Sequence, residues 1–156
     1  MLYLMQHGAA LSKEEDPERP LSEGGIADVQ NLARLLRAAG IEFDDVFHSG
    51  KLRARQTAEI LADTIPPERG PEELRGLGAT DPAAPMAEEI AGWTRRVALV
   101  SHMPLVARLT GALVADDEEQ APAAFTAGTM VALGAGDRGW QIQWLLRPEL
   151  LASRND

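Results

Sequence analysis

The fold is decided by residues 97–114, VALVSHMPLVARLTGALV, where a strand pattern passes directly into a helix pattern. The first five residues, VALVS, form a short apolar run that is typical of a buried strand. Pro104 suits the first turn of a helix, and three leucines then recur at helical spacing. The stretch therefore predicts a buried strand followed by a helix, with His102 between the two.

The same succession of strand and helix occurs twice upstream. Residues 1–6 predict a short buried strand, and after a polar loop Ser22 can cap a helix that Gly40 ends. Residues 44–49, DDVFHS, predict a second short strand. Residues 51–65, KLRARQTAEILADTI, predict a second helix, which a pair of prolines closes.

The other segments complete an α/β pattern. Residues 66–86 are rich in proline, glycine and acidic residues and predict mostly loop, and residues 84–96, APMAEEIAGWTRR, predict a further helix. Residues 129–146, TMVALGAGDRGWQIQWLL, predict two strands around a Gly-Asp-Arg-Gly turn. The alternation predicts one domain over residues 1–156, a three-layer α/β/α fold with a mainly parallel central sheet and a C-terminal hairpin.

Composition limits what this chain is expected to bind. Its 156 residues carry a formal net charge of −9, which argues against general binding to nucleic acid or to an anionic membrane. No apolar run is long enough to cross a membrane, and the N-terminus lacks the pattern of an export signal. The absence of cysteine excludes disulfides, thiolate metal ligands and a cysteine nucleophile, and it fits a cytoplasmic location.

The three histidines lie where predicted strands end. His7 follows the first strand, His48 ends the second and His102 follows the third, while Arg53 lies at the start of the helix after the second strand. Ligands of open α/β sheets bind beyond the carboxyl ends of the strands, where helix N-termini add free N–H donors. Two imidazoles and a guanidinium meeting there predict an anion pocket suited to phosphoryl transfer, and Gly8 lets the backbone approach the anion.

Four segments, in this order, carry a resemblance to a known family: MQHGAA (5–10), RPLSEGG (19–25), HSGKLRARQTAEIL (48–61) and ALVSHMP (98–104). They resemble the Arg-His-Gly motif, the segment that follows it, the Ser-x-x-x-Arg-Ala-x-Gln-Thr-Ala motif and the second catalytic histidine of the histidine phosphatase superfamily, whose fold is phosphoglycerate mutase-like. The short length looks most like the SixA-type phosphohistidine phosphatases. The resemblance implies a phosphatase that removes phosphoryl groups from phosphohistidine on a signalling protein.

The resemblance also implies a role for each matching residue. His7 would be the nucleophile that becomes transiently phosphorylated, Arg53 would hold the phosphoryl oxygens, and His102 would stabilise the transition state. The family's first arginine falls on Gln6, which keeps one amide donor but loses the charge and the bidentate fork. In a buried site this loss is expected to cost about 2 to 4 kcal/mol of transition-state stabilisation, about 30- to 1000-fold in rate.

Two features of the pocket stay open at this point. Gln6, Gly8 and Arg53 are expected to bind the substrate phosphate, and Arg19 and Arg55 are the two candidates to replace the missing charge. The candidate proton donors are Asp81 and Glu72, both in the predicted loop region. A phosphohistidine substrate lessens the need for a donor, because an imidazole leaving group has a far lower pKa than an alcohol.

The sequence predicts neither a cofactor nor a metal, since the three histidines are not at short ligand spacing. The expected partner is a phosphorylated protein or a small phosphate ester. Two other functions are compatible with the sequence. Because of Gln6, the chain could be a catalytically weakened member that binds phosphorylated partners; alternatively, it could be a phosphatase for a small metabolite. Ser49 is predicted to cap the following helix, His48 to be structural or at the rim, and Gln56 and Thr57 to pack and hydrogen-bond.

Overall fold

The strand β4 (Val97–Ser101) lies inside a six-stranded sheet, between β1 (Leu2–Gln6) and β2 (Asp45–His48). These three strands are parallel to one another, so their carboxyl ends meet at one edge of the sheet. The computed structural model describes residues 1–151 of the chain. The most clearly apolar segments therefore form the centre of the fold, as the sequence predicts.

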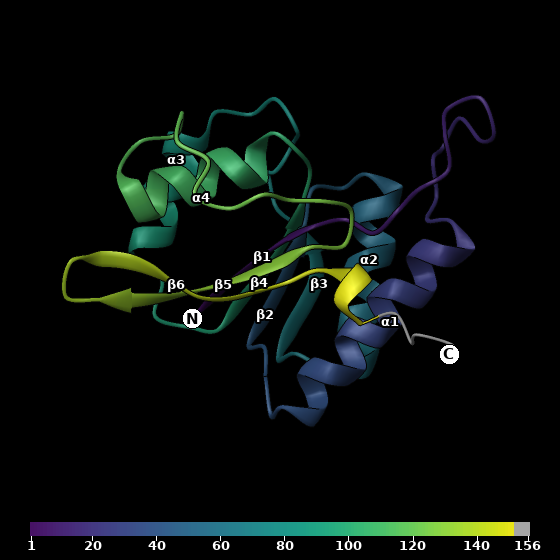
Figure 1. Cartoon of the computed structure of the whole chain (residues 1–156), viewed down its shortest axis with the longest axis horizontal. Helices are drawn as coiled ribbons and strands as arrows, with labels where there is room; N and C mark the ends of the chain where they lie inside the picture. Colours follow the sequence, from purple (N-terminus) through teal and green to yellow (C-terminus); the bar gives the residue numbers. More distant parts are fainter. Residues whose placement is uncertain (152–156) are drawn as a thin grey trace.

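The sheet continues on both sides of this central group (Figure 1). β3 (Arg69–Glu73) pairs parallel with β2, while β5 (Met130–Gly136) pairs antiparallel with β1 and, through the predicted turn, with β6 (Gly139–Leu146). The strand order is β3-β2-β4-β1-β5-β6. The predicted fold class is confirmed: an α/β fold with a mainly parallel sheet and a C-terminal hairpin.

Two pairs of helices cover the two faces of the sheet (Figure 1). α1 (Glu23–Ala38) and α2 (Leu52–Thr64) pack on one face, and α3 (Ala83–Ala91) and α4 (Leu105–Ala115) on the other. A short 3₁₀ helix, η1 (Pro148–Leu150), follows β6. These pairs form the outer layers of the predicted three-layer arrangement.

The core shows why the strand sequences are almost wholly apolar. In β1, Leu2 and Leu4 point into the cluster beneath α3 and α4, whereas Tyr3 and Met5 point into the cluster beneath α1 and α2. Because successive side chains alternate between the two faces, a sheet covered on both sides needs an apolar residue at every position. All five residues of β4 are buried for the same reason.

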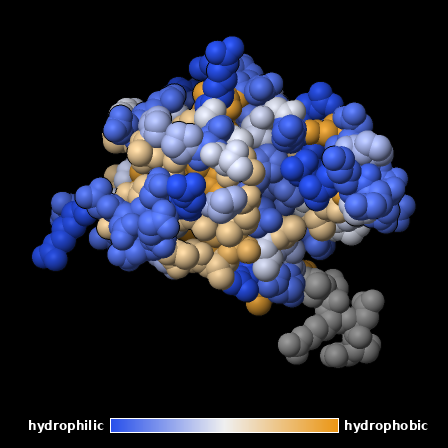
Figure 2. All heavy atoms as spheres, turned by 90° about the horizontal axis from the view of Figure 1, so that it is seen from above, coloured by the Kyte–Doolittle hydropathy of each residue, from blue (hydrophilic) through white to orange (hydrophobic). Residues whose placement is uncertain are grey.

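The surface is charged and largely hydrophilic. Figure 2 shows hydrophilic side chains over most of the face seen from above, with hydrophobic ones gathered nearer its middle. Within residues 1–151, no helix combines the length and the apolar character that a membrane span requires.

Two local predictions are wrong. Residues 69–73, predicted as loop, form β3, which its mostly exposed RGPEE sequence did not reveal. Backbone hydrogen bonds to β2 hold this edge strand, and an edge position tolerates its proline. The helix predicted at 84–96 begins at Ala83 and ends at Ala91, so Trp93 lies beyond it rather than on it.

Candidate active site

The parallel pairing of β1 with β4 places two histidines side by side. Gln6 is paired with Ser101 in the sheet, so His7 and His102 leave their strands next to each other. Their ring centroids are 4.9 Å apart, with an angle of 61° between the planes. Arg53, in the first turn of α2, donates a hydrogen bond from Nε to His7 Nε2 at 3.1 Å. The structure thus brings the three residues of the predicted anion pocket together.

The hydrogen bonds of His7 determine which ring nitrogen carries the proton. His7 Nδ1 lies 2.7 Å from the carbonyl oxygen of Gly8, and a carbonyl can only accept, so Nδ1 is the protonated nitrogen. Nε2 is then unprotonated, which agrees with its accepting a hydrogen bond from Arg53. His7 therefore presents a lone pair toward the guanidinium, which is the form that a nucleophilic imidazole requires.

Gly8 allows the chain to turn against α1 and α2. A Cβ at this position would lie 2.8 Å from Val29 Cγ2, closer than side chains can approach. The Gly8 amide donates to Thr57 Oγ1 at 3.0 Å, and Thr57 Oγ1 in turn donates to the carbonyl of Arg53 at 2.7 Å. Thr57 thus connects the loop that carries His7 to the helix that carries Arg53, which confirms its predicted structural role.

His102 is hydrogen-bonded to Ser49, a residue whose role was wrongly predicted. Ser49 Oγ and His102 Nε2 share a hydrogen bond of 2.5 Å. Ser49 does not cap α2; the cap position is Lys51, which makes no side-chain capping bond. The chain turns at Gly50, whose φ is +85°, and this turn separates Ser49 from the helix. The serine of the HSGKLRARQTA motif was the signal that could have identified this contact.

Burial and neighbouring positive charge keep both imidazoles neutral. Desolvation lowers the pKa of His7, and Arg53 and Arg19 lower it further against the opposing effect of the Gly8 carbonyl. Desolvation, followed by His7 and Arg53, lowers the pKa of His102 to about 4. Desolvation also lowers the pKa of Arg53, and Arg19 adds to the effect. The pocket is therefore positively charged in a chain of net charge −9, which favours a bound anion.

Acidification is expected to destabilise the fold through His102, whose side chain is almost fully buried. Its pKa is about 4 in the folded chain against an ordinary value of 6.5, so between these pH values the unfolded chain binds more protons. The stability that the neutral ring provides is complete above pH 6.5 and is lost as the pH falls toward 4. The difference corresponds to about 3 kcal/mol.

Urea unfolding of the wild type and of His102→Asn, at about pH 7 and about pH 4, measures this contribution. The wild type should lose more of its free energy of unfolding on acidification than the variant does. Comparing the two losses removes any difference in stability that the substitution itself causes. Equal losses in the two chains would contradict the prediction.

The position of the missing family arginine is occupied by a partly unsatisfied amide. Gln6 Oε1 is buried, and it has no hydrogen-bond partner among residues 1–151. Of the two candidates to replace the charge, Arg55 forms an ion pair with Glu59 on the exposed side of α2. Arg19 instead lowers the pKa of His7, Arg53 and His102 through its charge, and its Nε donates to the Leu11 carbonyl at 3.2 Å. Arg19 is thus a further positive charge that acts on the pocket besides Arg53, and Lys51 also lowers the pKa of His102.

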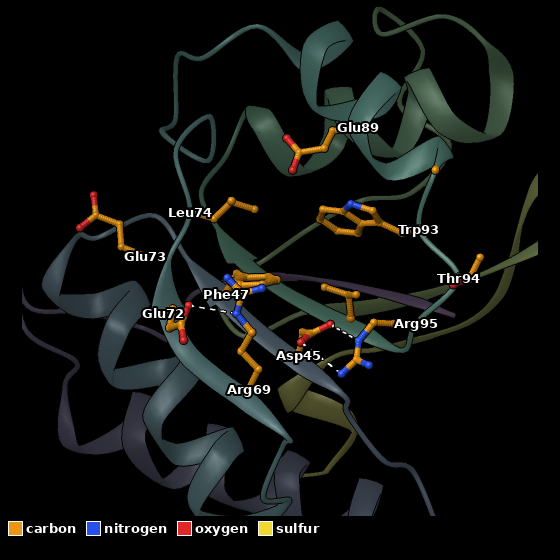
Figure 3. Close-up of a pocket in the computed structure, with 12 residues that line it drawn as sticks. Asp45, Phe47, Arg69, Glu72, Glu73, Leu74, Glu89, Trp93, Thr94 and Arg95 are labelled. Atoms are coloured by element: carbon orange, nitrogen blue, oxygen red, sulfur yellow. Dashed lines mark hydrogen bonds and ion pairs between the residues drawn. The ribbon is translucent and has the colours of Figure 1, made fainter.

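The two candidate proton donors have other partners. Asp81 Oδ2 accepts from the Gly78 amide at 2.7 Å, in a loop that Ser101 Oγ ties to the end of β4 by donating to the Leu77 carbonyl. Glu72 forms an ion pair of 3.2 Å with Arg69 and lines a separate cavity, whose lining includes neither histidine of the pocket (Figure 3). Neither carboxylate is hydrogen-bonded to His7 or His102.

A carboxylate that the sequence did not single out, that of Glu73, lies beside the turn next to the pocket. The Glu73 carboxyl group lies 2.6 Å from where a Cβ at Gly50 would be placed, beside the turn that carries Ser49. Its charge opposes the effect of burial, which lowers the pKa of His48. His48 itself is buried and accepts a hydrogen bond from the Gly50 amide through Nδ1 at 3.0 Å, so it supports this turn from within. Gln56 also has the structural contact predicted for it, accepting from the Leu21 amide at 2.8 Å.

Among the described residues, no group of three or more His, Cys, Asp or Glu side chains is arranged to hold a metal ion.

Known proteins resemble this chain in both sequence and structure. The model of the histidine phosphatase superfamily (branch 1) matches residues 2–77. Phosphohistidine phosphatase SixA of Escherichia coli is 28% identical over 151 residues, 90% of this chain and 92% of that protein. A protein of Picosynechococcus sp. is 33% identical over 112 residues, 66% of each chain.

The structural likeness extends over almost the whole fold. The solved structure of the protein histidine phosphatase SixA complexed with tungstate has a TM-score of 0.84 and 26% identity, covering 96% of this chain and 98% of that chain. The motifs that led to the pocket, the order of the strands and these likenesses agree with one another. The chain belongs to the histidine phosphatase superfamily, as a hydrolase of the phosphatase class.

Proposed function

We propose that this chain is a metal-free cytoplasmic phosphatase that works through a phosphohistidine intermediate at His7 and acts on phosphohistidine carried by a signalling protein. One observation carries the proposal: the unprotonated Nε2 of His7 faces the Arg53 guanidinium beside the neutral ring of His102. This arrangement combines a nucleophile with the charge that a phosphoryl group needs.

The first step transfers the phosphoryl group to His7. Nε2 attacks phosphorus with its lone pair while the bond between phosphorus and the leaving imidazole nitrogen breaks. That nitrogen keeps the electron pair, and the substrate ring leaves as neutral imidazole because its other nitrogen carries a proton. Arg53 gives up its hydrogen bond to His7 and binds the phosphoryl oxygens, together with His102 and the side-chain NH₂ group of Gln6. In the second step water attacks phosphorus, the bond to His7 breaks, and inorganic phosphate leaves.

The surroundings of the imidazoles favour a phosphorus–nitrogen substrate. An alcohol needs a proton as it leaves, yet Asp81 already accepts from Gly78, Glu72 is paired with Arg69, and no carboxylate of the described residues, Glu73 included, is hydrogen-bonded to His7 or His102. A phosphoimidazole that is protonated on its other nitrogen releases neutral imidazole, whose conjugate acid has a pKa of about 6.5, so it leaves with much less assistance. The phosphohistidine activity named for the SixA relative, and the tungstate bound in a SixA structure, support this choice of substrate and of anion.

Two peptides that differ only at the phosphorylated residue, phosphohistidine in one and phosphoserine in the other, test the substrate class. We expect kcat/KM to be at least about 10-fold higher for phosphohistidine, because only its leaving group departs without a strong acid. A chelator should leave both rates unchanged. Comparable rates on phosphoserine would favour the small-ester phosphatase, and loss of activity that added zinc or magnesium restores would overturn the metal-free mechanism.

Gln6 favours a second candidate function, a member that binds phosphorylated partners with little turnover. The buried Oε1 without a partner marks a site in which one donor of the family pattern is missing. The guanidiniums of Arg53 and Arg19 still offer an anion charged donors to bind. Replacing Gln6 by arginine distinguishes this binding function from the phosphatase function, because the two predict different changes in the rate of hydrolysis.

A further inference from the structure

A second cavity, of about 350 Å³, lies on the sheet face that α3 covers, away from the phosphoryl pocket. None of His7, His102 and Arg53 lines it. In Figure 3, Phe47 and Arg69 lie on the side of the sheet, and Trp93 and Glu89 on the side of α3. A volume of this size is within the range of small-ligand sites, and its two aromatic rings give it apolar walls.

One side of this cavity already binds a guanidinium of the chain itself. The Arg69 guanidinium carbon lies 5.3 Å from the centroid of the Phe47 ring, and Arg69 Nε donates to Glu72 at 3.2 Å. An aromatic face together with a carboxylate is an effective combination for an organic cation, because the ring attracts the charge and the carboxylate accepts its N–H groups.

The other side offers the same combination with no cation on it. The Trp93 ring centroid lies 6.4 Å from that of Phe47, and the Glu89 carboxylate projects from α3 above the indole (Figure 3). Within residues 1–151, Glu89 forms no ion pair and Trp93 holds no cation over its ring. Four carboxylates and two guanidiniums line the cavity, and both guanidiniums are already paired with carboxylates. The excess negative charge favours a further cation.

The cavity is within reach of the phosphoryl pocket along the chain. Phe47 lies two residues before Ser49, which contacts His102, and two residues of strand span roughly 7 Å. Glu73, at the rim of the cavity, lies beside the Gly50 turn. An extended peptide covers about 3.3 Å per residue, so a residue two to four positions from a phosphohistidine would reach the cavity.

We propose that this cavity receives an arginine or lysine side chain of the phosphorylated partner, next to Trp93 and Glu89, and thereby selects partners with a basic residue near the phosphohistidine. The proposal rests on the proposed function for its choice of partner. It gives the acidic chain a specific contact that the phosphoryl pocket, which is positively charged, does not provide.

Binding is tested first without any turnover. The probe is an unphosphorylated heptapeptide with a central histidine and arginine three residues to each side, compared with its glutamate counterpart. The NMR signal of the Trp93 indole N–H, assigned with Trp93→Phe, should move with the arginine peptide and not with the glutamate peptide. No movement with the arginine peptide, or equal movement with both, would overturn the proposal.

Kinetics with the phosphohistidine forms of the same peptides give the second test. Glu89→Gln and Trp93→Ala should each raise KM for the arginine peptide about three- to tenfold with kcat unchanged, and should leave a small phosphate ester unaffected. Glu88→Gln, on the same helix but lining a different cavity, is the matched control. Normal turnover without preference for the arginine peptide would refute the proposed role of the cavity and leave the proposed phosphatase function standing. Selective binding of the arginine peptide without turnover would refute the phosphatase function and leave the role of the cavity standing.

Discussion

The His7→Asn variant should form no phosphoenzyme, and its turnover of a phosphohistidine peptide should fall by about 1000-fold or more. Asparagine can still donate a hydrogen bond from its amide to the Gly8 carbonyl and adds no charge, so the pocket is expected to keep its shape. What it loses is the lone pair of Nε2, which is unprotonated in His7 because Nδ1 carries the proton and donates it in the hydrogen bond to Gly8. The variant therefore removes the nucleophile while it preserves the hydrogen bond to Gly8.

Acid-labile phosphate retained on the protein after rapid quenching measures the intermediate directly. His48→Asn is the matched control, because His48 is a buried histidine at the end of the neighbouring strand that is not hydrogen-bonded to Arg53. That variant should still acquire the label. An acid-labile adduct that persists in His7→Asn would show that another residue is the nucleophile, and thermal unfolding would establish whether either variant has lost its fold.

The elements that could be predicted from sequence are those whose stability comes from apolar burial. β4 and β1 are buried on both faces, and burial on both faces leaves a continuous apolar run that a reader of the sequence can recognise. β3 was missed because its RGPEE sequence is mostly exposed, and only backbone hydrogen bonds to β2 place it in the sheet. Such bonds require no particular side chains, so they leave no pattern in the sequence.

The candidate site divides in the same way. The sequence was sufficient to predict that His7, His102 and Arg53 lie close together. The carboxyl ends of parallel strands meet at one edge of the sheet, and each of these residues follows such an end. The position of Ser49 after a strand did not reveal its contact with His102, because its direction depends on the left-handed turn at Gly50; only the serine of the motif was a signal. Glu73 escaped notice for the related reason that its strand was not predicted.

The Gln6→Arg variant is expected to raise kcat/KM by about 30- to 1000-fold, the inverse of the loss assigned to the missing guanidinium. The side chain leaves β1 immediately before His7, and its Oε1 is buried without a hydrogen-bond partner. An arginine there replaces that unsatisfied acceptor with donors, and it adds a bidentate fork for the phosphoryl oxygens. Because Arg53 and Arg19 are already nearby, the variant should also be less stable in the absence of an anion and regain that stability when phosphate is added.

Initial rates on the phosphohistidine peptide, with vanadate inhibition measured in parallel, separate the two functions that Gln6 leaves open. Suppose that the natural chain binds vanadate but hydrolyses the peptide slowly, while the arginine variant hydrolyses it quickly. This result would identify a binding protein whose catalytic activity is weakened at this one position. Comparable rates in both chains mean instead that Arg19 already supplies the second cation, and Arg19→Ala should then lower kcat/KM by about 10-fold or more. If Arg19→Ala also left the rate unchanged, the site would need only one guanidinium, and the expected cost of Gln6 would be wrong.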